Sequence, residues 1–105
     1  MINRMLFLFC LLVGVVGAQA AEHTVGQLNK QFTTEEITIK KGDVVQFRNQ
    51  DPFFHNVFSL SDSKFFDLGS YPEGESRGVT FEDAGEIEVE CAIHPSMKLK
   101  IHVAD

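Results

Sequence analysis

The residues with the clearest chemical potential lie near the C-terminus of the chain. Cys91, His94 and Met97 fall within seven residues and follow the spacing C-x-x-H-x-x-M. A tight loop that joins two strands can bring this thiol, imidazole and thioether to one point. Sulfur ligands combined with imidazole suit a soft or borderline metal ion. The spacing therefore predicts a metal site.

The donor types narrow the choice of metal. Two histidines and one cysteine in a trigonal set, with a weakly bound methionine, form the blue-copper arrangement. Zinc prefers four strong ligands and has little use for methionine. The loop supplies only one imidazole, and His55, between two predicted strands, is the best candidate for the second. The plainer alternatives are that Cys91 is a small buried apolar residue and that Met97 only packs in the core.

The first twenty residues do not read as part of a folded domain. Arg4 precedes an uncharged apolar run at residues 5–16, and residues 17–20 are mostly small. This pattern predicts a secretory signal peptide at residues 1–20, cleaved after Ala20. A membrane anchor is the alternative, but the run is shorter than the roughly 20 residues that a spanning helix needs.

Export makes the cysteine content informative. Cys10 would leave with the leader, so the mature domain at residues 21–105 would keep only Cys91. A cysteine without a partner in an oxidising compartment is a liability unless a ligand occupies it. This argument favours the metal reading of Cys91 independently of its spacing.

The charge composition of the chain limits the classes of binding partner. The chain has 15 acidic and 9 basic residues, a net charge of −6, which becomes −7 when Arg4 is lost. Such a balance argues against nucleic acid and against anionic membrane surfaces as partners. We expect a monomer with no membrane attachment in its mature form.

Short alternating segments separated by turn residues predict an all-β domain. In the last two strands, Cys91 shares a face with Ile87 and Val89, and Met97 shares one with Leu99. Both sulfur residues are therefore expected to face the interior. Residues 63–68 read as a short turn and residues 69–74 as a loop. Predicted strands cover residues 37–39, 45–49, 56–60, 79–81, 87–91 and 97–103.

Two segments, 54–57 (Phe-His-Asn-Val) and 91–97 (Cys-Ala-Ile-His-Pro-Ser-Met), together resemble a cupredoxin. The resemblance implies a Greek-key β-sandwich or barrel of about seven to eight strands with one type 1 copper, Cu(II)/Cu(I). His55, Cys91 and His94 would bind the copper, with His94 at the solvent edge and Met97 on the axis. Asn56 would support the site by donating its backbone amide to the Cys91 sulfur.

The resemblance also implies a function. The mature protein would be periplasmic or secreted and would carry single electrons between a donor and an acceptor of the cytochrome c or dehydrogenase type. These partners would dock transiently near His94. Four protein ligands leave no open position for a substrate, so we do not expect an enzyme. The alternative function is copper handling by a periplasmic chaperone or resistance protein.

Three further features have a plain and a functional interpretation. Cleavage after Ala20 would place His23 third, where an N-terminal amine, two amides and an imidazole can chelate a second Cu(II), although a disordered terminus is the plainer reading. The stripe Glu86, Glu88 and Glu90 is interpreted as a solvated sheet face rather than a docking site. Some of the four phenylalanines at positions 53, 54, 65 and 66 are expected to form an exposed patch near the metal loop.

Overall fold

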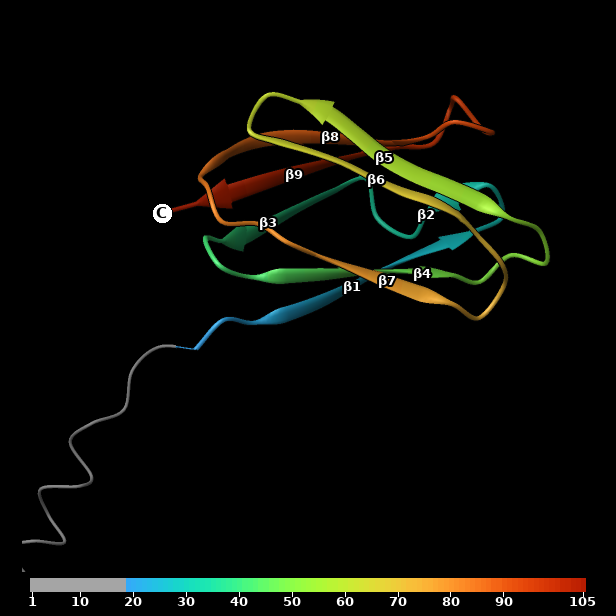
Figure 1. Ribbon diagram of the computed structural model, residues 1–105, viewed down its shortest axis with the longest axis horizontal. Coiled ribbons are helices and arrows are strands. Elements are labelled where there is room, and N and C mark those ends of the chain that lie inside the picture. The colour runs from blue at the N-terminus through green and yellow to red at the C-terminus, as the bar shows by residue number, and fades with distance from the viewer. Residues whose placement is uncertain (1–18) are drawn as a thin grey trace, which may run out of the picture.

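Two β-sheets stack face to face and enclose one core in this computed structural model, which describes residues 19–105 (Figure 1). The predicted leader therefore lies almost entirely outside the described residues. Nine strands are assigned in the described part of the chain: β1 (Glu22–Leu28), β2 (Gln31–Phe32), β3 (Glu36–Lys40), β4 (Val44–Asn49), β5 (His55–Ser61), β6 (Lys64–Tyr71), β7 (Ser76–Thr80), β8 (Gly85–Cys91) and β9 (Lys98–Ala104). Within these residues no helix has the length and apolar character to cross a membrane.

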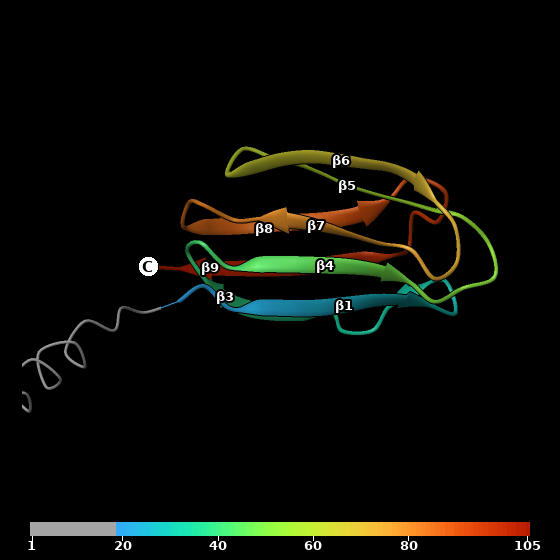
Figure 2. The ribbon, with the colours of Figure 1, turned by 60° about the horizontal axis from the view of Figure 1, so that its bottom comes forward.

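The chain changes sheet repeatedly as it proceeds. One sheet has the strand order β2-β1-β4-β7 and the other the order β3-β9-β8-β5-β6. The pairs β1 with β4 and β3 with β9 are parallel, and all the other pairs are antiparallel. Figure 1 shows one sheet above the other, whereas in Figure 2 the strands of one sheet overlap those of the other. The all-β sandwich predicted from the sequence is confirmed, with a two-residue β2 taking the strand count slightly above expectation.

The core forms where alternating apolar residues of both sheets meet. In β8 and β9 the inward residues are all 4% exposed or less: Ile87, Val89, Cys91, Leu99, Ile101 and Val103. The outward residues between them are polar, as expected for a sheet with one face in water. This alternation fixes the register, because a one-residue slip would move every apolar side chain to the solvent face.

The turn predicted at residues 63–68 is wrong, because that segment belongs to the edge strand β6. This strand forms a hairpin with β5 and continues through Gly69 to Tyr71. Its mixed composition gave no clean alternation, since only Phe66 and Tyr71 are fully buried in it. Backbone hydrogen bonds to β5 therefore hold β6 in the sheet more than burial of its side chains does.

A second unexpected strand is β1, the segment that contains His23. Residues 25–27 are buried in succession, so the segment lacks the alternating pattern of a half-buried strand. Gly26 allows this packing, because a Cβ there would lie 3.0 Å from the Thr33 methyl group. Gln27 is fully buried and accepts a 2.7 Å hydrogen bond from the Tyr71 hydroxyl, which ties the two sheets together.

Candidate metal centre

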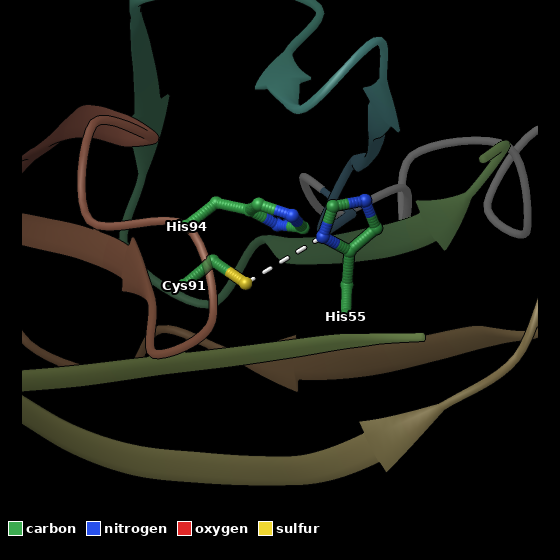
Figure 3. A group of neighbouring side chains, drawn as sticks. All are labelled: His55, Cys91 and His94. Atoms are coloured by element: carbon green, nitrogen blue, oxygen red, sulfur yellow. Dashed lines mark hydrogen bonds between the residues drawn. The ribbon is translucent and has the colours of Figure 1, made fainter. Parts of the chain in front are cut away.

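The ends of two neighbouring strands bring the first two predicted ligands together. His55 opens β5 and Cys91 closes β8, and these strands are antiparallel partners with Val57 opposite Cys91. Cys91 Sγ lies 3.5 Å from Nδ1 of His55 across 36 residues of sequence. Both side chains are almost completely buried, with 0% and 1% exposure. Figure 3 shows the thiol and the two imidazoles pointing toward one another.

The loop after β8 contributes the third donor. One ligand atom from each of His55, Cys91 and His94 lies within 4.8 Å of the other two. The loop is held in place at both ends, because Ala92 donates to the Asn56 carbonyl at 3.0 Å and Met97 to the His94 carbonyl at 2.9 Å. Three convergent donors of this kind can hold a single ion.

An unsatisfied nitrogen shows that the pocket fits a metal. Nδ1 of His94 is buried and has no hydrogen-bond partner within the described residues. A buried polar atom without a partner is costly, and metal coordination removes that cost. Burial lowers the pKa of His94, and the neighbouring His55 and Lys30 lower it further. The imidazole is therefore neutral at neutral pH, as a metal ligand must be.

Asn56 lies beside the Cys91 sulfur, as the sequence analysis expected. Its backbone amide donates to Cys91 Sγ at 3.4 Å, a normal length for a hydrogen bond to sulfur. An amide that donates to a thiolate stabilises negative charge on the sulfur and fixes its direction. Asn56 therefore acts on the site through its backbone, while its side chain is half-buried.

Asp51 is a supporting residue that the sequence analysis missed. Its carboxylate accepts a 2.7 Å hydrogen bond from Nε2 of His55, and it also accepts the backbone amides of Asn29 and Lys30 at 2.6 and 3.1 Å. Burial alone would raise the pKa of Asp51, but the hydrogen bonds from His55, Lys30 and Asn29 outweigh it and hold that pKa below its ordinary value. The ionised carboxylate thus keeps the proton of His55 on Nε2 and leaves Nδ1 free to bind an ion.

The tight β1–β2 turn and the β4–β5 loop form the support for Asp51. Asn29 and Lys30 both adopt positive φ angles, 56° and 61°, so that their amides point at the carboxylate. Buried Asn49 holds the loop from the other side, since its side-chain amide donates to the carbonyls of Phe53 and Tyr71 at 2.7 and 3.0 Å. The only local signal in the sequence was an acidic residue four positions before His55.

Phe53 packs against both histidines of the site, whose ring centroids lie 5.1 Å apart. Its ring centroid lies 5.3 Å from that of His55 and 5.4 Å from that of His94. The Lys30 ammonium lies 6.0 Å from the Phe53 centroid on the outer side. These contacts limit the rotation of both imidazoles.

Met97 lies directly after the ligand loop and before β9. It is 1% exposed, and its backbone closes the turn that begins at His94. The position is compatible with a weak axial thioether, and that role stays a prediction. The site lies inside the sandwich end, and only His94 among the predicted ligands is partly exposed.

The remaining histidines lie elsewhere. His23 is in β1 with Nε2 3.0 Å from an oxygen of Asp43, and His102 lies in β9 beside Glu36 and Glu86. Consecutive amides of an extended strand point to opposite edges, so the second Cu(II) chelate at His23 would require the start of β1 to leave β4. The glutamate stripe lies on the solvent face of the sheet, as expected, opposite basic side chains of β9: Glu86 opposite His102, Glu88 opposite Lys100 and Glu90 opposite Lys98.

Comparison with known proteins agrees with this geometry. A family model described as copper binding proteins, plastocyanin/azurin family, matches residues 19–104. The chain therefore belongs to the plastocyanin/azurin family of copper-binding proteins and is a cupredoxin.

Individual relatives are more distant. Methylamine utilization protein MauL of Methylorubrum extorquens is 26% identical over 97 residues, covering 91% of this chain and 85% of that protein. Amicyanin of Paracoccus versutus is 29% identical over 82 residues, which are 75% of this chain and 62% of the curated amicyanin. The crystal structure of that amicyanin matches with a TM-score of 0.70 and covers 85% of each chain.

An enzyme also shares the fold. A Cu-containing nitrite reductase from Thermus scotoductus matches with a TM-score of 0.76 and 26% identity, over 88% of this chain but only 24% of the reductase. The cofactor of the present chain is copper, and the candidate site is the cluster His55, Cys91 and His94 with Met97 nearby. Family and relatives together support a copper electron-transfer protein.

Proposed function

We propose that this chain is a periplasmic or secreted blue-copper protein that carries single electrons between redox partners. His55, Cys91 and His94 would hold the copper, and Met97 would contribute a weak thioether ligand. The observation that carries the proposal is the convergence of three donor atoms within 4.8 Å, two of them on buried residues. The relatives with amicyanin and MauL names support the same class.

Copper bound here supplies a one-electron couple, and the chain's own residues keep the donors in place. His55 is fixed by Asp51, the Cys91 sulfur by the Asn56 amide, and the ligand loop by its two backbone hydrogen bonds. Donors that are held by the fold need little rearrangement when the charge of the ion changes. A rigid site of this kind suits repeated electron transfer.

Electrons would leave through His94, the only partly exposed member of the ligand set. Three of the five exposed large apolar residues of the described chain lie at this end of the sandwich: Leu28, Phe54 and Ile93, at 40%, 54% and 52% exposure. An apolar rim without charge pairs suits brief docking with a redox protein of the cytochrome c or dehydrogenase type. Phe65 and Phe66 do not contribute to this rim, since Phe65 lies on the edge strand β6 and Phe66 is buried.

Export rests on the leader at residues 1–20, which lies almost entirely outside the described residues. The absence of a second cysteine in residues 21–105 and the single thiol held among metal donors are both suited to an oxidising compartment. We expect the mature protein to begin at Ala21 and to be monomeric.

Copper handling is the competing function. A chaperone must release its ion readily, whereas two of the three donors here are 1% exposed or less and one is anchored by a buried carboxylate. An enzymatic role is less favoured, because four protein ligands around the ion would leave no open position for a substrate.

An absorption spectrum separates these functions. A copper-loaded carrier is expected to be blue and to bleach reversibly on addition of one electron equivalent. A Cys91→Ser variant should fold, as judged by circular dichroism, yet show no blue band. A colourless wild-type protein that gives its copper quickly to a chelator would support handling instead.

A further inference from the structure

At the end of the sandwich opposite to the metal site, the buried carboxylate of Asp43 contacts the first residues of the domain. Asp43, 5% exposed, lies just before β4, whose other end leads to Asp51 and His55. One of its oxygens accepts the backbone N–H of Ala21 at 2.9 Å. The other lies 3.0 Å from Nε2 of His23 and accepts the amide of Lys40 at 3.0 Å. Figure 1 shows the chain entering the sandwich at this end, remote from the loop between β8 and β9.

The chemical nature of the Ala21 nitrogen depends on whether the leader is present. Within a longer chain it is a neutral amide with one proton. After cleavage behind Ala20 the same atom is an α-ammonium with a positive charge. Hydrogen bonds from His23 and from the backbone of Lys40 and Ala21 lower the pKa of Asp43 to about 2, so its carboxylate is charged at neutral pH. Processing would thus put a positive charge on the donor and convert an amide-to-carboxylate hydrogen bond into an ion pair.

We propose that removal of the leader after Ala20 creates an ion pair between the new α-ammonium of Ala21 and Asp43, and that this pair locks the start of β1 against β4. The inference rests on the proposed cleavage site and is independent of the copper chemistry. It goes beyond electron transfer, because it makes leader removal a step that stabilises the fold.

The geometry makes the ion pair specific for a chain that begins at Ala21. The Ala21 carbonyl accepts the Val44 amide at 3.0 Å, and the parallel pairing begins with Glu22 beside Val44. One extra residue would carry the ammonium about 3.3 Å farther along the strand, where successive groups point to opposite edges. A one-residue extension therefore restores a neutral amide at Asp43 and places the charge elsewhere.

The lock competes with the Cu(II) chelate considered for His23. That chelate needs the Ala21 amine and the His23 imidazole, and both are engaged by Asp43. The ion pair therefore predicts that the mature holoprotein binds no second Cu(II) until β1 detaches from β4.

The test compares three copper-loaded proteins that differ only at the N-terminus. One begins with Ala21, one carries a single additional glycine before Ala21, and one begins with Nα-acetylated Ala21. Thermal unfolding at pH 7 and low salt should give the free Ala21 form the highest Tm, by about 4 °C. The difference should shrink in 1 M salt, because screening weakens a partly exposed pair.

Two controls make the result decisive. In an Asp43→Asn background the three forms should have equal Tm values, and all forms should share one absorption spectrum. Equal Tm values in the wild-type background, or a difference that survives Asp43→Asn, would overturn the ion pair. Mass spectrometry of the exported protein showing a start other than Ala21 would overturn it as well. Failure of the blue spectrum would instead count against the proposed function.

Discussion

The Asp51 carboxylate and the His55 imidazole form a buried pair, with 2.7 Å between the carboxylate oxygen and Nε2. The pair lies on the far side of the imidazole from the Cys91 sulfur, which faces Nδ1. Asp51 therefore determines which nitrogen of His55 is presented to the ion. It also connects the metal site to the β1–β2 turn through two backbone amides.

Replacing Asp51 with Asn should weaken copper binding. Asn offers one acceptor oxygen in place of two, so it cannot accept from Asn29, Lys30 and His55 together, and the support of His55 loosens. Loss of such a partner typically reduces metal affinity about 10- to 100-fold. Competition with a Cu(II) chelator measures this change, with Asp62→Asn on the exposed hairpin turn as the matched control. An Asp51→Asn protein with the parent affinity and spectrum would rule out the positioning role.

Met97→Leu separates the ligand role of Met97 from its packing role. Leucine conserves most of the buried volume, so the stability cost should stay below about 1.5 kcal/mol. The blue band should persist, because it depends on Cys91, while the reduction potential should rise as Cu(II) loses a donor. A tenfold selective loss of Cu(II) binding corresponds to about 59 mV for one electron. Voltammetry that finds no change in potential would assign Met97 to the core alone.

Polar substitutions at the apolar rim should slow electron transfer without changing the copper site. Phe54→Ser and Ile93→Ser each remove apolar contact area, and a loss of about 1.4 kcal/mol of docking energy slows the reaction about tenfold. The electron self-exchange rate of the protein can serve as the readout. Leu60→Ser and Phe65→Ser are matched controls, since these residues are 68% and 69% exposed on the β5–β6 hairpin. Equal slowing in both pairs would show that the rim has no special role.

Asp43 should make the fold resistant to mild acid. Its pKa is lowered to about 2 from an ordinary value of 3.8, so its contribution to stability is complete above pH 4 and disappears as the pH falls through 2. The Tm of Asp43→Asn should be lower than wild type at pH 5, and the gap should close by pH 2. Melting curves across this range test the prediction, with the exposed Asp83→Asn as a control. A gap that is constant with pH would show that the carboxylate charge is irrelevant.

Tyr71→Phe should destabilise the sandwich by about 1–3 kcal/mol, because it leaves the buried Gln27 oxygen without its donor. Burial raises the pKa of Tyr71, so the hydroxyl is protonated and donates throughout the working range. Urea unfolding gives the free energy. Adding Gln27→Leu to Tyr71→Phe should recover part of the loss, since both polar partners are then removed. No recovery would mean that cavity formation dominates.

The strands that contain the ligands were predictable, because each has one buried face. Strict alternation through Ile87, Val89 and Cys91 and through Leu99 to Val103 fixed both the strand type and the inward direction of Cys91. His55, Cys91 and His94, which the structure brings together, were chosen from residue type and spacing, and Met97 as a fourth ligand stays a prediction. The three strands that were missed, β1, the two-residue β2 and β6, have no such alternation and are specified by backbone pairing with β4, β1 and β5.

The residues that support the metal ligands could not be predicted from the local sequence pattern. Asp51 precedes a proline in a loop, where an acidic residue is ordinary, and its role depends on a turn more than twenty residues away in sequence. The glutamate stripe in β8 lies on the solvent face as expected, but its cross-strand partners were not predictable for a related reason. Only the register of β8 against β9 places Lys98 and Lys100 opposite Glu90 and Glu88.

The predicted ligands differ in how firmly the fold holds them. His55 begins a strand and is bonded on its far side to Asp51, whereas Nδ1 of His94 has no hydrogen-bond partner among the described residues and its backbone belongs to a six-residue connection between β8 and β9. If the site opens, we therefore expect His94 and its connection to move first, while His55 and Cys91 stay in place on their strands. The antiparallel pairing of β5 with β8 would keep His55 and Cys91 in their mutual position when His94 moves.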